Sequence, residues 1–313
     1  MIGRFLVGIT LLSMGVVSAV AQVGLPPRAD FDGDGKADYV VYRPTNGVWY
    51  VVPSSDPSAT ITEQWGLSGD IPLSGDFDGD GKTDFVVYRP SSGVWYVNPS
   101  SNLGMWYQEH WGQPGDIPLS GDFDGDRRAD LAVWRPSTGT WFIAPSNRPG
   151  TWYSQQWGLQ GDIPIIADFD GDGKIDIAVW RPSNGTWYVI PSTNPGAPYS
   201  QQWGLRGDIP VAGYFQGLRG ADFCVYRPSN GTWYILTGDT RIQLPPIQFG
   251  MPGDIPAPDD FDFDGKTDIT VWRPSGGLWY YIPSSAPSTW KVKQWGFLGD
   301  STVPTTASQG TFF

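Results

Sequence analysis

Short hydrophobic segments alternate with turn-forming residues along most of this chain. In one stretch, residues 85–89 and 93–97 are rich in β-branched and aromatic residues, and residues 90–93 supply the proline and glycine of a hairpin loop. Residues 71–75 and 106–111 form two further short segments. Apolar residues show no 3.6-residue period over a helix-length window. The pattern therefore predicts a unit of four short β-strands.

This unit recurs every 46 residues. Its acidic, glycine-rich segment starts at residues 30, 76, 122, 168, 214 and 260, and the repeats begin near residues 26, 72, 118, 164, 210 and 256. A repeated four-stranded unit of roughly 40 to 50 residues is typical of a β-propeller blade. We therefore expect an all-β, six-bladed β-propeller as a single domain over residues 22–313. An open β-solenoid, which would leave two exposed edges, is the alternative architecture.

The ends of the repeats predict how the ring closes. Leu25-Pro26 occupies the place that Ile71-Pro72 occupies one repeat later, so the first repeat is expected to contain its own first strand. The C-terminal tail, residues 301–313, then has two alternatives. It covers the closing seam, or it pairs as an extra strand.

Each acidic segment has the composition of a cation-binding loop. The second loop carries Asp76, Asp78, Asp80 and Asp84 at positions 1, 3, 5 and 9, and Lys82 at position 7. Side chains at the four acidic positions can converge on one point, and position 7 can add its backbone carbonyl. Calcium accepts six to eight oxygen ligands in flexible geometry, whereas magnesium requires a stricter octahedron. We therefore expect calcium, although a solvated turn would also use aspartate and glycine.

The expected ligands follow the same positions in five loops. They are Asp30, Asp32, Asp34, Lys36 and Asp38 in the first; Asp76, Asp78, Asp80, Lys82 and Asp84 in the second; Asp122, Asp124, Asp126, Arg128 and Asp130 in the third; Asp168, Asp170, Asp172, Lys174 and Asp176 in the fourth; and Asp260, Asp262, Asp264, Lys266 and Asp268 in the sixth.

Substitutions in three of the loops are expected to change how strongly each loop binds metal. Arg127 replaces the position-6 glycine of the third loop, which weakens that site, and Phe263 replaces the position-4 glycine of the sixth. The fifth loop has Tyr214, Gln216 and Leu218 where three carboxylates belong. We expect it to bind no metal, with Arg219 available as a fixed positive charge, so the chain should bind about five calcium ions.

The loop motif DxDGDGxxD resembles that of FG-GAP and VCBS-type repeat proteins, which are secreted or surface-exposed propellers. They include the integrin α-subunit head and some fungal and bacterial lectins. The resemblance covers nearly all of the chain after residue 21. It implies that positions 1, 3, 5 and 9 are the side-chain ligands, and that the function is adhesion or recognition.

Composition excludes several classes of function. The chain has 313 residues and a net charge of -12, which disfavours nucleic acid and anionic membranes as partners. Single cysteine and histidine residues, Cys224 and His110, argue against a disulfide scaffold, a zinc fold or a histidine-centred catalytic triad.

The N-terminal residues 1–21 have the features of a signal peptide. Arg4 supplies the positive charge, residues 5–17 are apolar, and Ala19-Val20-Ala21 gives a cleavage pattern. No later segment is apolar enough to span a membrane. We therefore expect a secreted or cell-surface protein.

Two sets of side chains recur with the repeats. A tryptophan stands at residues 49, 95, 141, 187, 233 and 279, and is expected in the core. An arginine precedes a proline at residues 43, 89, 135, 181, 227 and 273, and is expected to form an ion pair or to stack on a ring. The aspartates at 70, 116, 162, 208, 254 and 300 are expected to cap turns.

Aromatic residues at unevenly filled positions are candidates for a ligand site. Trp106, Trp152, Tyr199 and Trp290 are present in some repeats and absent from others, so they are candidate platforms for sugar stacking.

Three functions therefore compete. The first is a calcium-binding, non-enzymatic binding or adhesion module with an extracellular glycan or protein ligand. The second is a lectin with aromatic pockets between blades. The third is a polysaccharide lyase or hydrolase, but near-identical repeats offer no distinct acid/base pair. His110 is interpreted as a surface substitution where Gln64 and Gln156 stand in other repeats.

Overall fold

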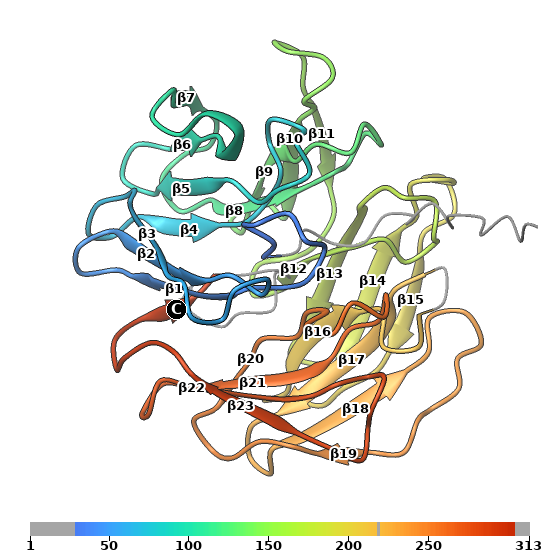
Figure 1. Cartoon of the computed structure of the whole chain (residues 1–313). Helices are drawn as coiled ribbons and strands as arrows, with labels where there is room; N and C mark the ends of the chain where they lie inside the picture. The colour runs from blue at the N-terminus through green and yellow to red at the C-terminus, as the bar shows by residue number, and fades with distance from the viewer. Residues whose placement is uncertain (1–28, 218–219, 304–313) are drawn as a thin grey trace, which may run out of the picture.

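The computed structural model describes residues 29–217 and 220–303. In these residues the chain forms short strands and one turn of 3-10 helix, η1 (Ser100–Asn102). The strands make six antiparallel sheets of four strands each, arranged around a common axis (Figure 1). The predicted all-β, six-bladed β-propeller is confirmed, and the open solenoid is wrong.

Blades 2 to 6 each take four consecutive strands from the chain. Blade 2 consists of β4 (Ile71–Leu73), β5 (Phe85–Arg89), β6 (Val94–Asn98) and β7 (Tyr107–His110). Blade 3 consists of β8 (Ile117–Gly121), β9 (Asp130–Arg135), β10 (Thr140–Ala144) and β11 (Tyr153–Gln156). Blade 4 consists of β12 (Ile163–Ala167), β13 (Asp176–Arg181), β14 (Thr186–Ile190) and β15 (Tyr199–Gln202). Blade 5 consists of β16 (Ile209–Gly213), β17 (Asp222–Arg227), β18 (Thr232–Leu236) and β19 (Ile247–Gln248). Blade 6 consists of β20 (Ile255–Pro256), β21 (Ile269–Arg273), β22 (Leu278–Ile282) and β23 (Lys291–Gln294).

Blade 1 joins the two ends of the described chain. It consists of β24 (Ser301–Thr302), β1 (Tyr39–Arg43), β2 (Val48–Val52) and β3 (Ile61–Gln64). β24 pairs antiparallel with β1, and in Figure 1 the strand that ends the described chain lies beside β1. The first repeat therefore does not contain its own first strand, and that expectation was wrong. Leu25 and Pro26 lie outside the described residues.

The pairing register of β24 with β1 shows that β24 takes the place of a first strand in blade 1. Ser301 lies opposite Tyr42, as Ile71 lies opposite Tyr88 in blade 2, so Ser301 occupies the place of a first strand in the repeat. Two alternatives were open for the tail, and Ser301 and Thr302 pair as an extra strand. An Arg43–Asp300 ion pair of 2.7 Å adds to this closure.

Each hairpin loop depends on a glycine. Gly93, between β5 and β6, has a φ of 69°, and a Cβ there would lie 2.4 Å from the carbonyl oxygen of Gly112. The hairpin can therefore contact the turn that leads to the next blade only because position 93 has no side chain.

Tryptophan side chains fill the core and join the blades. The row expected in the core is buried at every position, with exposed fractions of 0% to 4% at Trp49, Trp95, Trp141, Trp187, Trp233 and Trp279. Replacing one of them by alanine would cost about 3–5 kcal/mol. A second row reaches across the seams, because Trp65 Nε1 donates to the carbonyl oxygen of Tyr96 in the next blade at 3.1 Å.

The arginine row forms structural ion pairs. Each arginine lies 2.7–2.8 Å from an aspartate whose side chain is only 1% or 2% exposed. In blade 2 the guanidinium of Arg89 also lies 4.3 Å above the ring of Tyr96. Asp70 Oδ2 accepts the backbone N–H of Leu67 as well, at 2.9 Å, which confirms its predicted role as a turn cap.

The predicted signal peptide, residues 1–21, lies outside the described residues. Within the described part of the chain, we find no helix with the length and hydrophobicity needed to cross a bilayer.

Candidate metal centres

In blades 2 to 6 the acidic loop connects the first strand to the second, and in blade 1 it precedes β1. In the second loop, Asp76 Oδ1 accepts the N–H of Gly79 at 2.6 Å, and its Oδ2 accepts the N–H of Gly81 at 2.8 Å. Both glycines have positive φ, at 84° and 87°. The position-1 aspartate therefore folds the loop around its own carboxylate.

The position-9 aspartate fixes the loop to the blade. Asp84 precedes β5 and is completely buried. Its Oδ2 accepts the N–H of Phe77 at 2.8 Å, and its Oδ1 accepts the N–H of Ser100 at 2.7 Å. This carboxylate thus joins the acidic loop to the segment between β6 and β7.

In five loops, carboxylates from positions 1, 3 and 9 come together. One oxygen from each of the three lies within 4.8 Å of the other two. The triads are Asp30, Asp32 and Asp38; Asp76, Asp78 and Asp84; Asp122, Asp124 and Asp130; Asp168, Asp170 and Asp176; and Asp260, Asp262 and Asp268.

Two buried carboxylate oxygens indicate that the triads can hold a cation. Asp170 Oδ1 and Asp262 Oδ1 are buried and have no hydrogen-bond partner in the described chain. A buried carboxylate oxygen without a partner is costly. A hard cation would give both atoms a ligand, and the all-oxygen donor set suits calcium. The residues at positions 1, 3 and 9 therefore fit the expected ion.

Burial raises the pKa of the position-9 carboxylates, and repulsion from the other triad members adds to the effect. The pKa is about 7 for Asp38, about 6 for Asp84, about 7 for Asp130, about 7 for Asp176 and about 8 for Asp268. A bound divalent cation would favour the charged form and lower these values.

Position 5 lies outside the triads. Asp34 Oδ2 accepts the hydroxyl of Ser54 at 2.7 Å, and Asp264 Oδ2 accepts that of Ser284 at 2.6 Å. The structure therefore brings positions 1, 3 and 9 together and directs these position-5 side chains to serine hydroxyls.

Four of the basic residues at position 7 lie against the preceding loop. A Cβ added to Gly33 would lie 2.9 Å from Lys82 Cε, and one added to Gly79 would lie 2.7 Å from Arg128 Nε. Lys174 and Lys266 lie in the same way against Gly125 and Gly217. The sequence pattern predicted that these residues offer their backbone carbonyls to the cation. It did not predict this contact of their side chains.

The irregular loops differ from the others in the expected places. Arg127 has a φ of 71° and Phe263 a φ of 64°, so both adopt the left-handed conformation that glycine favours. In the fifth loop Tyr214 is buried, and Asp222 Oδ1 accepts the N–H of Gly238 at 2.8 Å. Leu218 and Arg219 lie outside the described residues.

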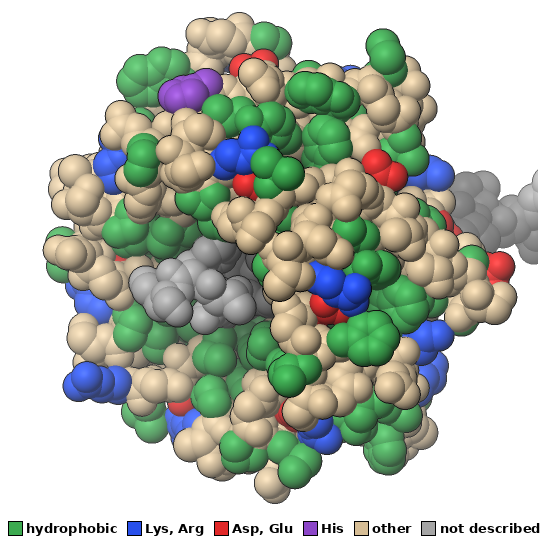
Figure 2. Space-filling model, turned by 90° about the vertical axis from the view of Figure 1, so that its left-hand side faces the viewer, with side chains coloured by type: hydrophobic (Ala, Val, Ile, Leu, Met, Phe, Trp, Pro, Cys, Tyr) green, Lys and Arg blue, Asp and Glu red, His purple; other side chains and the backbone are tan. Residues whose placement is uncertain are grey.

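Three of the four candidate ligand aromatics are exposed. The exposed fractions of Trp106, Trp152 and Trp290 are 50%, 59% and 61%. Figure 2 shows exposed hydrophobic side chains scattered over one face of the molecule. Tyr199 differs, because it is partly buried against the core of blades 4 and 5, and Arg241 lies 5.4 Å from its ring centre.

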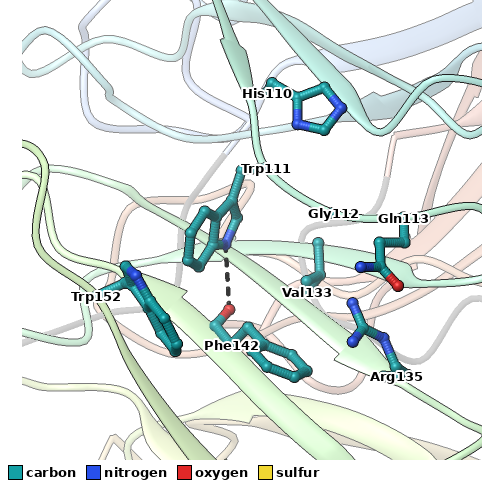
Figure 3. A pocket seen from close by; sticks show the side chains of 8 residues that line it. All are labelled: His110, Trp111, Gly112, Gln113, Val133, Arg135, Phe142 and Trp152. Carbon is teal, nitrogen blue, oxygen red and sulfur yellow. Dashed lines mark hydrogen bonds between the residues drawn. The ribbon is translucent and has the colours of Figure 1, made fainter.

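His110 is exposed, as expected for a surface substitution. It lines a cavity of about 340 Å³ between blades 2 and 3, together with Trp152 and Arg135 (Figure 3). Composition alone did not reveal this pocket. The signal that could have found it is the departure of His110 from the glutamine of the other repeats.

Comparison with known families agrees with this geometry. The model of the FG-GAP-like repeat family matches residues 30–87 and 122–179, which contain acidic loops one to four. The same loop recurs in the sixth blade, and all six blades share one topology. The matched segments are FG-GAP-like repeats, and the described chain as a whole is a six-bladed β-propeller.

Solved structures share the fold at low sequence identity. An Agrocybe aegerita lectin that recognises non-reducing terminal N-acetylglucosamine is 13% identical with a TM-score of 0.56, and the match covers 86% of this chain and 77% of that chain. A streptogramin B lyase is 11% identical with a TM-score of 0.51, covering 84% of each chain. A Staphylococcus aureus virginiamycin B lyase is 8% identical with a TM-score of 0.51, covering 85% of this chain and 86% of that chain. No curated protein matches the chain by sequence.

Proposed function

We propose that this protein is a calcium-binding, non-enzymatic binding or adhesion module that acts outside the cytoplasm. The observation that carries the proposal is the set of five carboxylate triads, each with three oxygen atoms within 4.8 Å of one another. Three carboxylates this close repel one another unless a cation neutralises them.

The residues at positions 1, 3 and 9 would hold the ion, and calcium would supply positive charge there. The position-1 carboxylate folds the loop, and the position-9 carboxylate connects it to the β6–β7 segment or its equivalent. Binding at each triad would therefore fix two surface segments of a blade at once. We propose that calcium makes the face of the ring that carries the acidic loops rigid enough to bind a partner.

The extracellular location rests on residues 1–21, which have the pattern of a signal peptide. Expression of the full chain followed by N-terminal sequencing of the exported protein tests it. Export with cleavage after Ala21 is the expected result, and retention of the uncleaved chain in the cytoplasm would contradict it.

The absence of enzymatic activity is also a proposal. It rests on the near identity of the repeats, which gives no pair of carboxylates a distinct acid and base role. The lyases named above share the fold at 8% and 11% identity, and such a likeness carries no activity across.

A carbohydrate ligand is the second candidate, and the exposed tryptophans favour it. Trp106 and Trp152 each lie beside a tryptophan of the preceding blade, with ring centres 5.8 Å and 6.0 Å apart. These pairs present aromatic surface at the seams between blades. The lectin that shares the fold recognises a sugar, which is in keeping with this candidate.

Two measurements test the proposal. Thermal melting in calcium and in a chelator should differ, because binding at ten times Kd contributes about 1.4 kcal/mol per site. Identical melting curves would contradict the calcium assignment. A glycan array, with and without calcium, then separates the candidates. Reproducible binding of a glycan supports the lectin, and repeated blanks favour a protein ligand.

A further inference from the structure

The cavity between blades 2 and 3 combines aromatic walls with polar groups. His110, Trp111 and Gln113 line it from the end of blade 2, and Arg135, Phe142 and Trp152 line it from blade 3 (Figure 3). Its volume of about 340 Å³ is at the small end of the range for ligand pockets, roughly 300–1,000 Å³. A ligand of one or two sugar rings has a suitable size.

The aromatic side of the pocket is held in place by both blades. Trp111 Nε1 donates a hydrogen bond of 3.2 Å to the backbone carbonyl of Phe142. The ring of Trp152 lies 6.0 Å from that of Trp111 and 6.4 Å from that of Phe142, and 59% of its surface is exposed. Trp152 is therefore a supported ring that remains open to solvent.

Three lining positions of this seam depart from the repeat, and each is unique among the six copies. His110 stands where the other repeats have Gln64, Gln156, Gln202, Gln248 and Gln294. Gln113 stands where they have Leu67, Leu159, Leu205, Met251 and Phe297. Phe142 stands where they have Tyr50, Tyr96, Tyr188, Tyr234 and Tyr280.

The change to Phe142 affects the arginine beside it. In blade 2, Arg89 Nη1 donates to the hydroxyl of Tyr96 at 2.9 Å. Arg135 keeps its two hydrogen bonds of 2.8 Å to Asp116, through Nε and Nη2, and lies 4.4 Å above the ring of Phe142. Because phenylalanine has no hydroxyl, Nη1 of Arg135 lacks the acceptor that Arg89 has.

The other two changes add polar groups to the same pocket. Gln113 replaces an exposed apolar side chain with an amide that can both donate and accept hydrogen bonds. In the first repeat, the glutamine equivalent to His110 donates to the carbonyl oxygen of Asn46 at 2.8 Å. His110 lines the pocket and makes no hydrogen bond through its ring within the described chain.

We infer that the seam between blades 2 and 3 is a carbohydrate site of different specificity from any other seam, and that it takes a neutral sugar ring. The apolar face of the sugar stacks on Trp152, and its hydroxyl groups bond to Arg135, Gln113 and His110. Asp116 already neutralises Arg135, so the pocket does not require an anionic ligand. This inference rests on the second candidate of the proposed function, a carbohydrate ligand.

The polar groups of the pocket lie away from the metal centres. Asp130, a triad member, and Arg135 stand at opposite ends of β9, roughly 16 Å apart at 3.3 Å per residue. Trp152 precedes Tyr153, on which the charges of Asp130 and Asp124 act. Calcium binding is therefore measured for each variant beside sugar binding, so that a defect in the pocket and a defect in calcium binding are distinguished.

The experiment uses the protein in calcium and three variants. Trp152→Ala removes the platform, and the triple variant H110Q/Q113L/F142Y restores the residues that other seams carry. Met105→Ala is the control, because it removes an exposed apolar side chain that does not line the pocket. Circular dichroism and melting curves show whether each variant folds.

The probes are the methyl glycosides of glucose, galactose, mannose and N-acetylglucosamine, titrated by calorimetry. We expect at least one glycoside to bind, with a loss of affinity of at least about tenfold in Trp152→Ala and in the triple variant. Met105→Ala should keep the affinity of the wild type for it.

Two results overturn the inference in different ways. Unchanged binding in Trp152→Ala and in the triple variant would place the sugar elsewhere and leave the carbohydrate function intact. If no glycoside binds to calcium-loaded wild-type protein, both this site and the carbohydrate candidate are wrong, while calcium binding stands.

Discussion

The backbone N–H of Thr83 donates a hydrogen bond of 2.7 Å to the carbonyl oxygen of Asp30. It thereby connects position 8 of the second acidic loop to position 1 of the first. Equivalent bonds of 2.7–3.2 Å follow around the ring, from Ala129 to Asp76, Ile175 to Asp122, Ala221 to Asp168, Thr267 to Tyr214 and Ala37 to Asp260. The six loops thus form a closed chain of contacts, and an ion that fixes one loop also fixes a neighbour.

Substitutions at position 9 distinguish a metal ligand from a merely buried carboxylate. Asp176 belongs to a triad and Asp222 does not, yet both side chains are almost completely buried and both accept backbone N–H groups. Asp176→Asn should remove one site's share of the calcium-induced stabilisation, about 1.4 kcal/mol at ten times Kd. Asp222→Asn should leave the calcium-induced change unaltered. Melting curves with and without calcium measure both, and an equal loss in the two variants would argue against the triads.

Stability without calcium should depend on pH with a defined sign. Burial raises the pKa of Asp38 and Asp176 to about 7, whereas in the unfolded chain an aspartate has a pKa of about 3.9. The folded state therefore binds more protons, so this contribution to stability is complete below about pH 4 and is lost as the pH rises through about 7. Urea titrations in calcium-free buffer should give a lower free energy of unfolding at about pH 8 than at about pH 5.

Calcium should reverse this trend, because the ion competes with protons for the same oxygens. The stabilisation gained on adding calcium should grow over the same pH range. A calcium effect that is constant from about pH 5 to about pH 8 would show that these carboxylates are not its ligands.

The repeat determined most of what the sequence could predict. The strand predicted at residues 85–89 is the observed β5, and the 46-residue period fixed six blades, because both depend on local residue patterns. Ring closure was mispredicted because Leu25-Pro26 and Ser301-Thr302 stand at equivalent repeat positions, and only the three-dimensional pairing decides between them.

The metal centres and the pocket also differ in how far the sequence could predict them. Positions 1, 3 and 9 of the loops could be identified from spacing, whereas the serine partner of Asp34 lies 20 residues away and belongs to another loop of the same blade. The pocket at His110 unites residues from two blades. Spacing within one repeat does not reveal contacts across a seam.

Arg127 provides a test of backbone strain. Its φ of 71° lies in the left-handed region, where the equivalent Gly35, Gly81 and Gly173 have φ values of 87° to 92°. Arg127→Gly should stabilise the protein by about 1 kcal/mol, because an L-residue with a side chain pays roughly 1–2 kcal/mol there and glycine's extra flexibility cancels part of the gain. Gly81→Arg should have the opposite effect. Urea titrations that show Arg127→Gly to be destabilising would contradict this account.

The closing strand can be tested by shortening the chain. A chain that ends at Asp300 lacks the two residues of β24 and also Val303, whose side chain is 5% exposed in the core beside β1. Compared with a chain that ends at Val303, it should be less stable by about 1.5 kcal/mol or more, which is the burial of one valine. Equal melting temperatures for the two chains would show that β24 does not hold the ring closed.

The most direct test counts the ions. Protein equilibrated with calcium and freed of unbound ion should contain about five calcium ions per chain by elemental analysis, one for each triad. The same protein carrying Asp176→Asn should contain about four. A calcium content near zero in the wild-type protein would contradict the central claim that the five triads are metal centres.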